Sequence, residues 1–204
     1  MSLPLLILAA GSSRRFGDID KRRLTLPKGG EMLRAMIRRG GKAGLDVRPV
    51  LRRGDPLADQ LPVPSILVDG AEAGMGASLA AAVAQLLADD PDGSREAMLV
   101  MPADLPLIRI HSIREVVAKA AGDRVVVPFC DGHRGHPVAI GRQFWPELLS
   151  LTGDSGAKGL IQSLRQNRAG SVLPLELADP GIYRDVDTPT ALAEVLKSLD
   201  PPTP

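Results

Sequence analysis

Short apolar runs alternate with amphipathic segments along this chain. Residues 5–10, 47–51 and 97–101 are almost wholly apolar, which predicts strands buried on both faces. Residues 32–37 and 79–87 instead carry their apolar side chains at helical spacing, which predicts helices that cover a sheet. Strands and helices in alternation predict a three-layer αβα, Rossmann-like fold with a mostly parallel sheet.

The second half of the chain continues this pattern with a local hairpin. Residues 125–127 and 138–140 flank an Asp131-Gly132 turn, which predicts an antiparallel pair of strands. Ser112 and Glu115 have the spacing of a capping box, which predicts the start of a helix. Further elements are expected as helices near residues 144–145 and 160–164, a late strand ending at Asp185-Val186-Asp187, and a last helix begun by Thr188-Pro189.

Length and composition narrow the class of protein. The 204 residues contain no internal repeat or linker, so we expect one domain over residues 1–200 and a flexible tail over residues 201–204. A net charge of +1 gives no general attraction to nucleic acid or to a membrane surface. No stretch approaches membrane-spanning length, and a single cysteine suits a reducing compartment. We therefore expect a soluble, cytoplasmic protein that binds neither nucleic acid nor membrane.

A glycine-rich, basic loop follows the first apolar run. Gly11 and Gly17 allow the backbone to approach a ligand closely and to point amide groups at an anion. Arg14, Arg15 and Lys21 add positive charge. The spacing fits neither the Walker loop nor the dinucleotide fingerprint. The loop therefore reads as a polyphosphate site at the carboxyl end of a central strand, or else as an ordinary basic loop.

Carboxylates follow two of the predicted strands. Asp104 comes directly after the run 97–101, between Pro102 and Pro106. Near a polyphosphate, a carboxylate at a strand end suits Mg²⁺, which takes one or two carboxylates plus phosphate oxygens. A cap on the next helix is the alternative for Asp104. Asp187 could complete the same metal site, or it could be only a turn residue.

The segment after the Asp131-Gly132 turn carries two histidines. Cys130, His133 and His136 have a spacing that invites a zinc site, but the sequence offers no evident fourth ligand. We interpret the segment instead as a rim on which Arg134 and His136 hold an anionic acceptor, with a solvated hairpin as the alternative. The glycine-rich stretch around Asp154 offers a second set of amides for an anion, unless it is only a turn with Asp154 as a helix cap.

These stretches, in this order, resemble the MobA-like nucleotidyltransferases, most closely the molybdenum-cofactor cytidylyltransferases. The resemblance is carried by Leu8-Ala9-Ala10-Gly11 with Ser13, Arg15 and Gly17, by Gly74-Met75-Gly76-Ala77-Ser78, by Pro102-Ala103-Asp104-Leu105-Pro106, by Gly135-His136-Pro137 with Gly153-Asp154, and by Asp185-Val186-Asp187-Thr188-Pro189. Three features depart from the family pattern. Lys21 lies one residue further from Gly17 than is usual, Arg22-Arg23 replace apolar residues, and Asp69 stands where Asn is common.

The resemblance implies a role for each matching position. Nucleotide contacts would come from Ala9, Ala10, Gly11, Ser12, Ser13, Gly76 and Ser78. Catalysis would involve Lys21 and Arg15 on the phosphates together with Asp104, and Mg²⁺ would be held by Asp104 and Asp187. The acceptor would contact Arg134, His136 and Asp154.

The resemblance also implies the reaction. A phosphate-bearing acceptor, the molybdenum cofactor, would attack the α-phosphorus of a nucleoside triphosphate and release pyrophosphate. Ala10 favours CTP, since the guanylyl branch of the family has Gly there, and GTP is the alternative. A transient contact with a molybdoenzyme or its chaperone would follow from that role. A non-catalytic nucleotide-binding or cofactor-delivery protein is the alternative from another class.

Overall fold

The computed structural model describes residues 2–11, 20–26 and 30–186. The strands are β1 (Pro4–Leu8), β2 (Asp46–Arg52), β3 (Ile66–Val68), β4 (Ala97–Pro102), β5 (Val125–Cys130), β6 (His133–Arg134), β7 (Val138–Gly141) and β8 (Val172–Glu176). The α-helices are α1 (Met32–Lys42), α2 (Met75–Ala88), α3 (Ile110–Lys119), α4 (Trp145–Leu148) and α5 (Lys158–Asn167). Short 3-10 helices cover Lys21–Arg23, Ala58–Gln60, Ala71–Ala73, Arg142–Phe144 and Pro180–Ile182.

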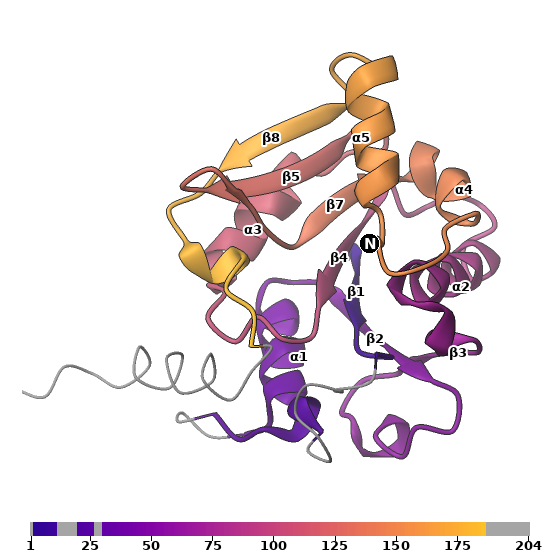
Figure 1. The fold of residues 1–204 in the computed structure, drawn as a ribbon, viewed down its shortest axis with the longest axis vertical. Coiled ribbons are helices and arrows are strands. Elements are labelled where there is room, and N and C mark those ends of the chain that lie inside the picture. Colours follow the sequence, from indigo (N-terminus) through magenta and orange to yellow (C-terminus); the bar gives the residue numbers. More distant parts are fainter. Residues whose placement is uncertain (1, 12–19, 27–29, 187–204) are drawn as a thin grey trace, which may run out of the picture.

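The strands form one mixed sheet (Figure 1). β3, β2, β1 and β4 lie side by side and run parallel. β7 is antiparallel to β4 and to β5, whereas β8 is parallel to β5 on its other side. β6 pairs with the second half of β5 and completes the predicted hairpin. The prediction of a three-layer α/β fold with a mostly parallel sheet is confirmed.

Alternate residues of the buried strands face the two helical layers. In β1, Leu5 and Ile7 pack with the apolar faces of α1 and α3, whereas Leu6 packs with α2, α4 and α5. All three side chains are fully buried. This is why the strand reads as a continuous apolar run rather than as an alternating one. No helix in the described part of the chain is long and apolar enough to cross a membrane.

The predicted helix start at Ser112 is wrong. α3 begins at Ile110 and has no side-chain cap from its own first turn. The buried carboxylate of Asp179 takes that role, since it accepts the Arg109 amide at 2.9 Å and the Ser112 hydroxyl at 2.6 Å. The cap therefore comes from a distant loop, which sequence spacing cannot predict.

The predicted late strand ending at 185–187 is also wrong. The last described strand, β8, ends at Glu176. The chain then turns at Asp179, whose side chain accepts the Gly181 amide at 3.0 Å, and enters a 3-10 helix. Val186 donates a backbone hydrogen bond at 3.0 Å to Asp104, which lies in the loop after β4, and it forms no strand ladder among the described residues. The predicted last helix and the tail lie outside the described residues.

Candidate active site

The predicted loop and the predicted aspartate meet at one edge of the sheet. β1 and β4 are parallel neighbours, with Leu8 opposite Pro102, so their carboxyl ends lie together (Figure 1). Ala9 extends β1, since its amide donates to a β2 carbonyl at 3.0 Å, and Ala10 is also buried. Asp104 follows β4 at the same edge.

The backbone at Gly11 is open to a ligand. Gly11 is exposed, and a Cβ added there would meet no atom of the described residues within 4 Å. Its position beyond the buried end of β1 is the one expected for a phosphate contact. Ser12, Ser13 and Arg15 lie outside the described residues, so their predicted roles stay predictions.

Lys21 and Asp104 form the ionic centre of the candidate site. The Lys21 ammonium lies 2.6 Å from Oδ2 of Asp104, and the side chains are 22% and 12% exposed. Oδ1 of Asp104 is buried and has no hydrogen-bond partner among the described residues. A buried carboxylate oxygen without a donor is costly, and it is also the ligand type that Mg²⁺ and Mn²⁺ prefer. The residues present therefore fit a divalent cation.

Val186 contacts the backbone of Asp104. The Val186 amide donates to the Asp104 carbonyl at 3.0 Å, which brings the chain immediately before Asp187 to the ionic centre. Asp187 itself lies outside the described residues. Within the described part of the chain, no group of three His, Cys, Asp or Glu side chains could hold a metal. Any metal there would therefore depend on Asp104, on residues outside that part, and on substrate oxygens.

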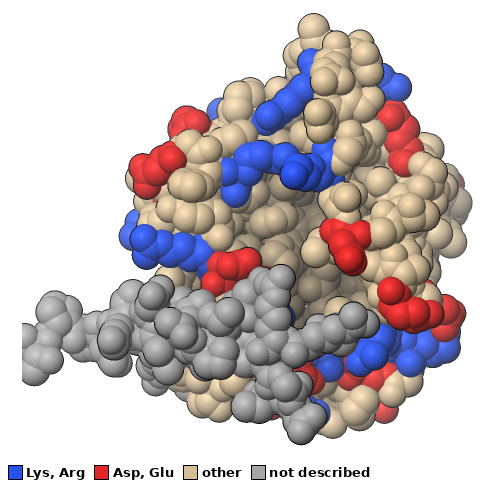
Figure 2. Space-filling model, viewed as in Figure 1, with Lys and Arg blue, Asp and Glu red and all other residues tan. Residues whose placement is uncertain are grey.

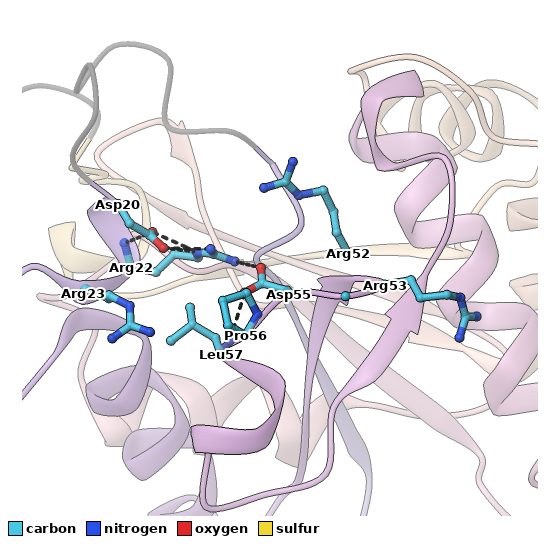
Figure 3. Close-up of a pocket in the computed structure, with 9 residues that line it drawn as sticks. Asp20, Arg22, Arg23, Arg52, Arg53, Asp55, Pro56 and Leu57 are labelled. Carbon is cyan, nitrogen blue, oxygen red and sulfur yellow. Dashed lines mark hydrogen bonds and ion pairs between the residues drawn. The ribbon is translucent and has the colours of Figure 1, made fainter.

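Arg22 braces the base of the glycine-rich loop, a role that sequence reasoning missed. Its guanidinium donates to both oxygens of Asp20 and to Asp55 at 2.5 Å (Figure 3). It also donates to the Ala9 carbonyl at 3.0 Å. Burial alone would lower the pKa of Arg22, but the hydrogen bonds to these carboxylates outweigh burial and raise it. The only sequence signal was that Arg22 stands where the family has an apolar residue.

A basic cavity opens beside this brace. It has a volume of about 320 Å³ and lies beyond the carboxyl end of β2, between the short helix that carries Lys21 and the loop after Arg52 (Figure 3). Its lining residues are Asp20, Arg22, Arg23, Arg52, Arg53, Gly54, Asp55, Pro56 and Leu57. Lys21 and Asp104 do not line it, so it adjoins the ionic centre rather than containing it.

The start of α2 packs against the second glycine-rich stretch. The Gly76 amide donates to the Gly153 carbonyl at 2.7 Å, and a Cβ on Gly76 would lie 2.7 Å from the Thr152 carbonyl oxygen. The Ser78 hydroxyl is buried and donates back to the Gly74 carbonyl at 3.3 Å. Gly76 therefore has a packing role here. Its nucleotide contact, like that of Ser78, stays a prediction.

Asp154 lies exposed beside the same helix start. It is not the cap of the following helix, because α5 begins at Lys158 with Ala157 at the cap position. Its Oδ1 lies 2.6 Å from the place where a Cβ on Gly74 would be. The structure thus brings Asp154 next to the predicted nucleoside end of the site, and its role toward the acceptor stays a prediction.

His136 lies within reach of the charges of both Asp104 and Arg134. Burial lowers the pKa of His136, against its hydrogen bond to the Val100 backbone and the charge of Asp104, while the charge of Arg134 lowers it further. The imidazole is therefore neutral at pH 7, and its buried Nδ1 has no partner among the described residues. The other two candidate zinc ligands, His133 and Cys130, contact different residues. The His133 ring stacks on Tyr183 at 4.7 Å, and the Cys130 thiol contacts the neighbouring Asp131 at 3.5 Å.

Similar structures have been solved from other organisms, although no curated protein matches the sequence. Rv0371c from Mycobacterium tuberculosis H37Rv has a TM-score of 0.79 at 25% identity, over 96% of this chain and 97% of that chain. Its manganese complex has a TM-score of 0.77 at 22% identity, over 98% of this chain and 100% of that chain. Molybdopterin-guanine dinucleotide biosynthesis protein A from Archaeoglobus fulgidus has a TM-score of 0.66 at 16% identity, over 96% of this chain and 98% of that chain.

A family model also matches most of the chain. The model of the MobA-like NTP transferase domain matches residues 5–169. That span runs from β1 through Asp104 and the β5–β6 hairpin to the end of α5. It includes the described parts of the ionic centre and of both glycine-rich stretches. The chain belongs to the family of MobA-like NTP transferase domains.

Proposed function

We propose that this protein transfers a nucleoside monophosphate from a nucleoside triphosphate to a phosphate-bearing acceptor. An oxygen of the acceptor phosphate forms a bond to the α-phosphorus, the bond between the α-phosphorus and the bridging oxygen to the β-phosphate breaks, and pyrophosphate leaves. The acceptor phosphate is already ionised, so the reaction needs no side-chain nucleophile. Positioning and charge neutralisation supply the rate enhancement.

The observation that carries this proposal is the Lys21–Asp104 pair at the switch between β1 and β4. Lys21 offers a cation that can turn from Asp104 to a phosphate oxygen, and the 2.6 Å contact holds it at this edge of the sheet until then. Asp104 has one oxygen engaged with Lys21 and one buried oxygen with no partner among the described residues. Such an arrangement suits a triphosphate accompanied by a divalent cation.

A divalent cation at Asp104 would neutralise charge on the α-phosphate and on the departing pyrophosphate. The manganese complex of the mycobacterial relative supports a divalent metal in this fold. The remaining work falls to the chain itself. The Gly11 backbone approaches the phosphates, Lys21 stabilises the charge that develops during transfer, and Arg15 is proposed to bind the distal phosphates.

We propose CTP as the nucleotide and the molybdenum cofactor as the acceptor. Ala10 supports CTP, because the guanylyl branch of the family has Gly at that position, whereas this chain resembles the cytidylyl branch most closely. GTP is the competing choice, and the name of the Archaeoglobus fulgidus protein, which refers to a guanine dinucleotide, supports it. The neutral His136 and the cation of Arg134 would face the acceptor from the β5–β6 side.

The test is release of pyrophosphate in the presence of the acceptor, with each nucleoside triphosphate and with Mg²⁺ or Mn²⁺. Asp104→Asn keeps the size of the side chain and removes its charge, so turnover should fall by about a hundredfold or more. Asp123→Asn, an exposed aspartate paired with its neighbour Arg124, should change nothing and serves as the matched control.

Other outcomes separate the alternatives. Near-normal turnover by Asp104→Asn would contradict the proposed centre. Preference for GTP would correct the nucleotide and leave the mechanism intact. Binding of a nucleotide by the wild-type protein, with no turnover for any triphosphate and either metal, would make the protein a non-catalytic nucleotide binder.

A further inference from the structure

Two arginines from different elements flank one aromatic ring on the acceptor side. Arg134 of β6 lies directly opposite Phe129 of β5 in the hairpin register. The guanidinium carbon of Arg165, on α5, lies 5.6 Å from the centre of the Phe129 ring. The two guanidinium groups therefore share one patch of surface, although their residues are far apart in the chain.

Neither guanidinium is neutralised by a carboxylate of the described residues. Glu176 lies opposite Phe129 on the other side of β5, but no ion pair joins it to Arg134 or Arg165. A neighbouring arginine, by contrast, forms an ion pair. Arg168, just after the end of α5, also lies over an aromatic ring but pairs with Glu147 at 3.0 Å. An unneutralised pair of like charges is unfavourable unless an anion binds between them.

The electrostatics of Arg134 agree with this picture. Burial lowers its pKa, and the nearby charge of Arg165 lowers it further. Arg165 is thus close enough for its charge to act on Arg134. Adjacent cations that repel each other gain more from a doubly charged anion than either would gain alone.

The pair lies on the same side of the molecule as the ionic centre. His136 is close enough to both Asp104 and Arg134 for their charges to act on its imidazole. Figure 2 shows a hollow in this face, with Lys and Arg side chains along its upper rim, where α5 and the β5–β6 hairpin lie in Figure 1.

We propose that Arg134 and Arg165 together bind a doubly charged oxyanion group of the acceptor, of the phosphate monoester class. Each guanidinium can present a planar fork of donors to such a group. That this anion belongs to the acceptor rests on the proposed function, whereas anion binding by the pair does not.

The first experiment detects the anion without any nucleotide. The probe is methyl phosphate, added to ¹⁵N-labelled protein while the arginine Nε–H signals are followed by NMR at low salt. Arg134→Gln, Arg165→Gln and Arg168→Gln assign the signals. The Arg134 and Arg165 signals should move with one common Kd. Arg165→Gln should weaken the binding seen at Arg134 by about tenfold, and Arg168→Gln should leave it unchanged.

A different result would overturn the site. Unchanged affinity at Arg134 in Arg165→Gln would show that the two residues do not act on one anion. Equal losses in Arg165→Gln and Arg168→Gln would show only the general effect of removing a positive charge. Absence of any shift in either signal would also refute anion binding by the pair.

A second experiment tests the link to the acceptor. In the pyrophosphate-release assay, Arg165→Gln should raise KM for the acceptor by about tenfold and leave KM for the triphosphate unchanged. A rise in KM for the triphosphate instead would overturn the assignment to the acceptor. Lack of turnover in the wild-type protein would refute the proposed function, while the NMR result would still decide whether the pair binds an anion.

Discussion

Replacing Arg22 should lower the free energy of unfolding more than replacing any other arginine of the candidate site. Arg22→Met keeps the length and the apolar stem of the side chain but removes the guanidinium. Three acceptors then lose a donor, namely Asp20, the Ala9 carbonyl and Asp55. Asp55 suffers most, because its side chain is only 2% exposed and water cannot replace the lost partner.

The magnitude follows from burial. Breaking a buried ion pair by removing one partner costs about 3–5 kcal/mol, since an uncompensated charge is left behind. The Arg22 side chain is 11% exposed and that of Asp20 is 30% exposed, so the loss belongs at the lower end, about 3 kcal/mol. Arg23→Met is the matched control. The Arg23 side chain is 41% exposed, and its ion pair with Glu31 is long, at 3.8 Å. Its replacement should therefore cost about 0.5 kcal/mol or less.

Urea unfolding followed by the fluorescence of Trp145 measures this difference. Trp145 is the single tryptophan of the chain and is fully buried, so its emission reports loss of the core. Burial raises the pKa of Asp20, but hydrogen bonding to Arg22 outweighs burial and lowers it. That contribution to stability is complete above the ordinary value of 3.8 and is lost as the pH falls below it. The difference in the free energy of unfolding between wild type and Arg22→Met should therefore become smaller below about pH 4. A loss of unfolding free energy under about 1 kcal/mol at pH 7, or one equal to that of Arg23→Met, would refute the stabilising role of Arg22.

Two further predictions concern the framework of the fold. The hydroxyl of Ser94 and other donors lower the pKa of Asp90 to about 2, so this carboxylate stabilises the folded state above the ordinary value of 3.8 and loses that effect as the pH falls toward 2. Asp90→Asn should accordingly lower Tm at pH 7 and converge with wild type near pH 2, as thermal melts across this range would show. In α1, Gly41→Ala should stabilise the protein by about 0.5–1 kcal/mol, because Ala favours a helix and no atom lies within 4 Å of the new Cβ. Gly40→Ala should destabilise it in the same urea experiment, because its Cβ would lie 2.6 Å from Leu5.

The parts of the fold that could be predicted from sequence are those set by local pattern. β1 and β4 are buried on both faces, so their apolar runs were visible without any knowledge of their neighbours. Asp104 was visible for a related reason, since a carboxylate directly after a buried strand needs a special partner. Its partner was less accessible, because the Lys21–Asp104 contact joins residues 83 positions apart.

The parts that could not be predicted depend on contacts between distant segments. The cap of α3 comes from Asp179, 67 positions after Ser112, so a nearby capping-box spacing predicted the wrong start. Arg22 and Asp55 are 33 positions apart, so the departure at Arg22 from the family pattern did not indicate which residue it contacts. Arg165 looks like any exposed residue of an amphipathic helix until the hairpin places Phe129 and Arg134 beneath it.

The order of strands explains why the ionic centre and the arginine pair share one side of the sheet. The chain adds β2 and β3 on one side of β1 and then returns to place β4 on the other side. This reversal creates a crevice at the carboxyl ends of β1 and β4, the usual ligand site of an open α/β sheet. β7 is antiparallel to β4, with Val138 opposite Val100, so it is the amino end of β7 that reaches this crevice. His136 and Arg134 precede that end and are thereby brought to the same edge. A parallel strand in place of β7 would have carried them to the opposite edge of the sheet, away from Asp104.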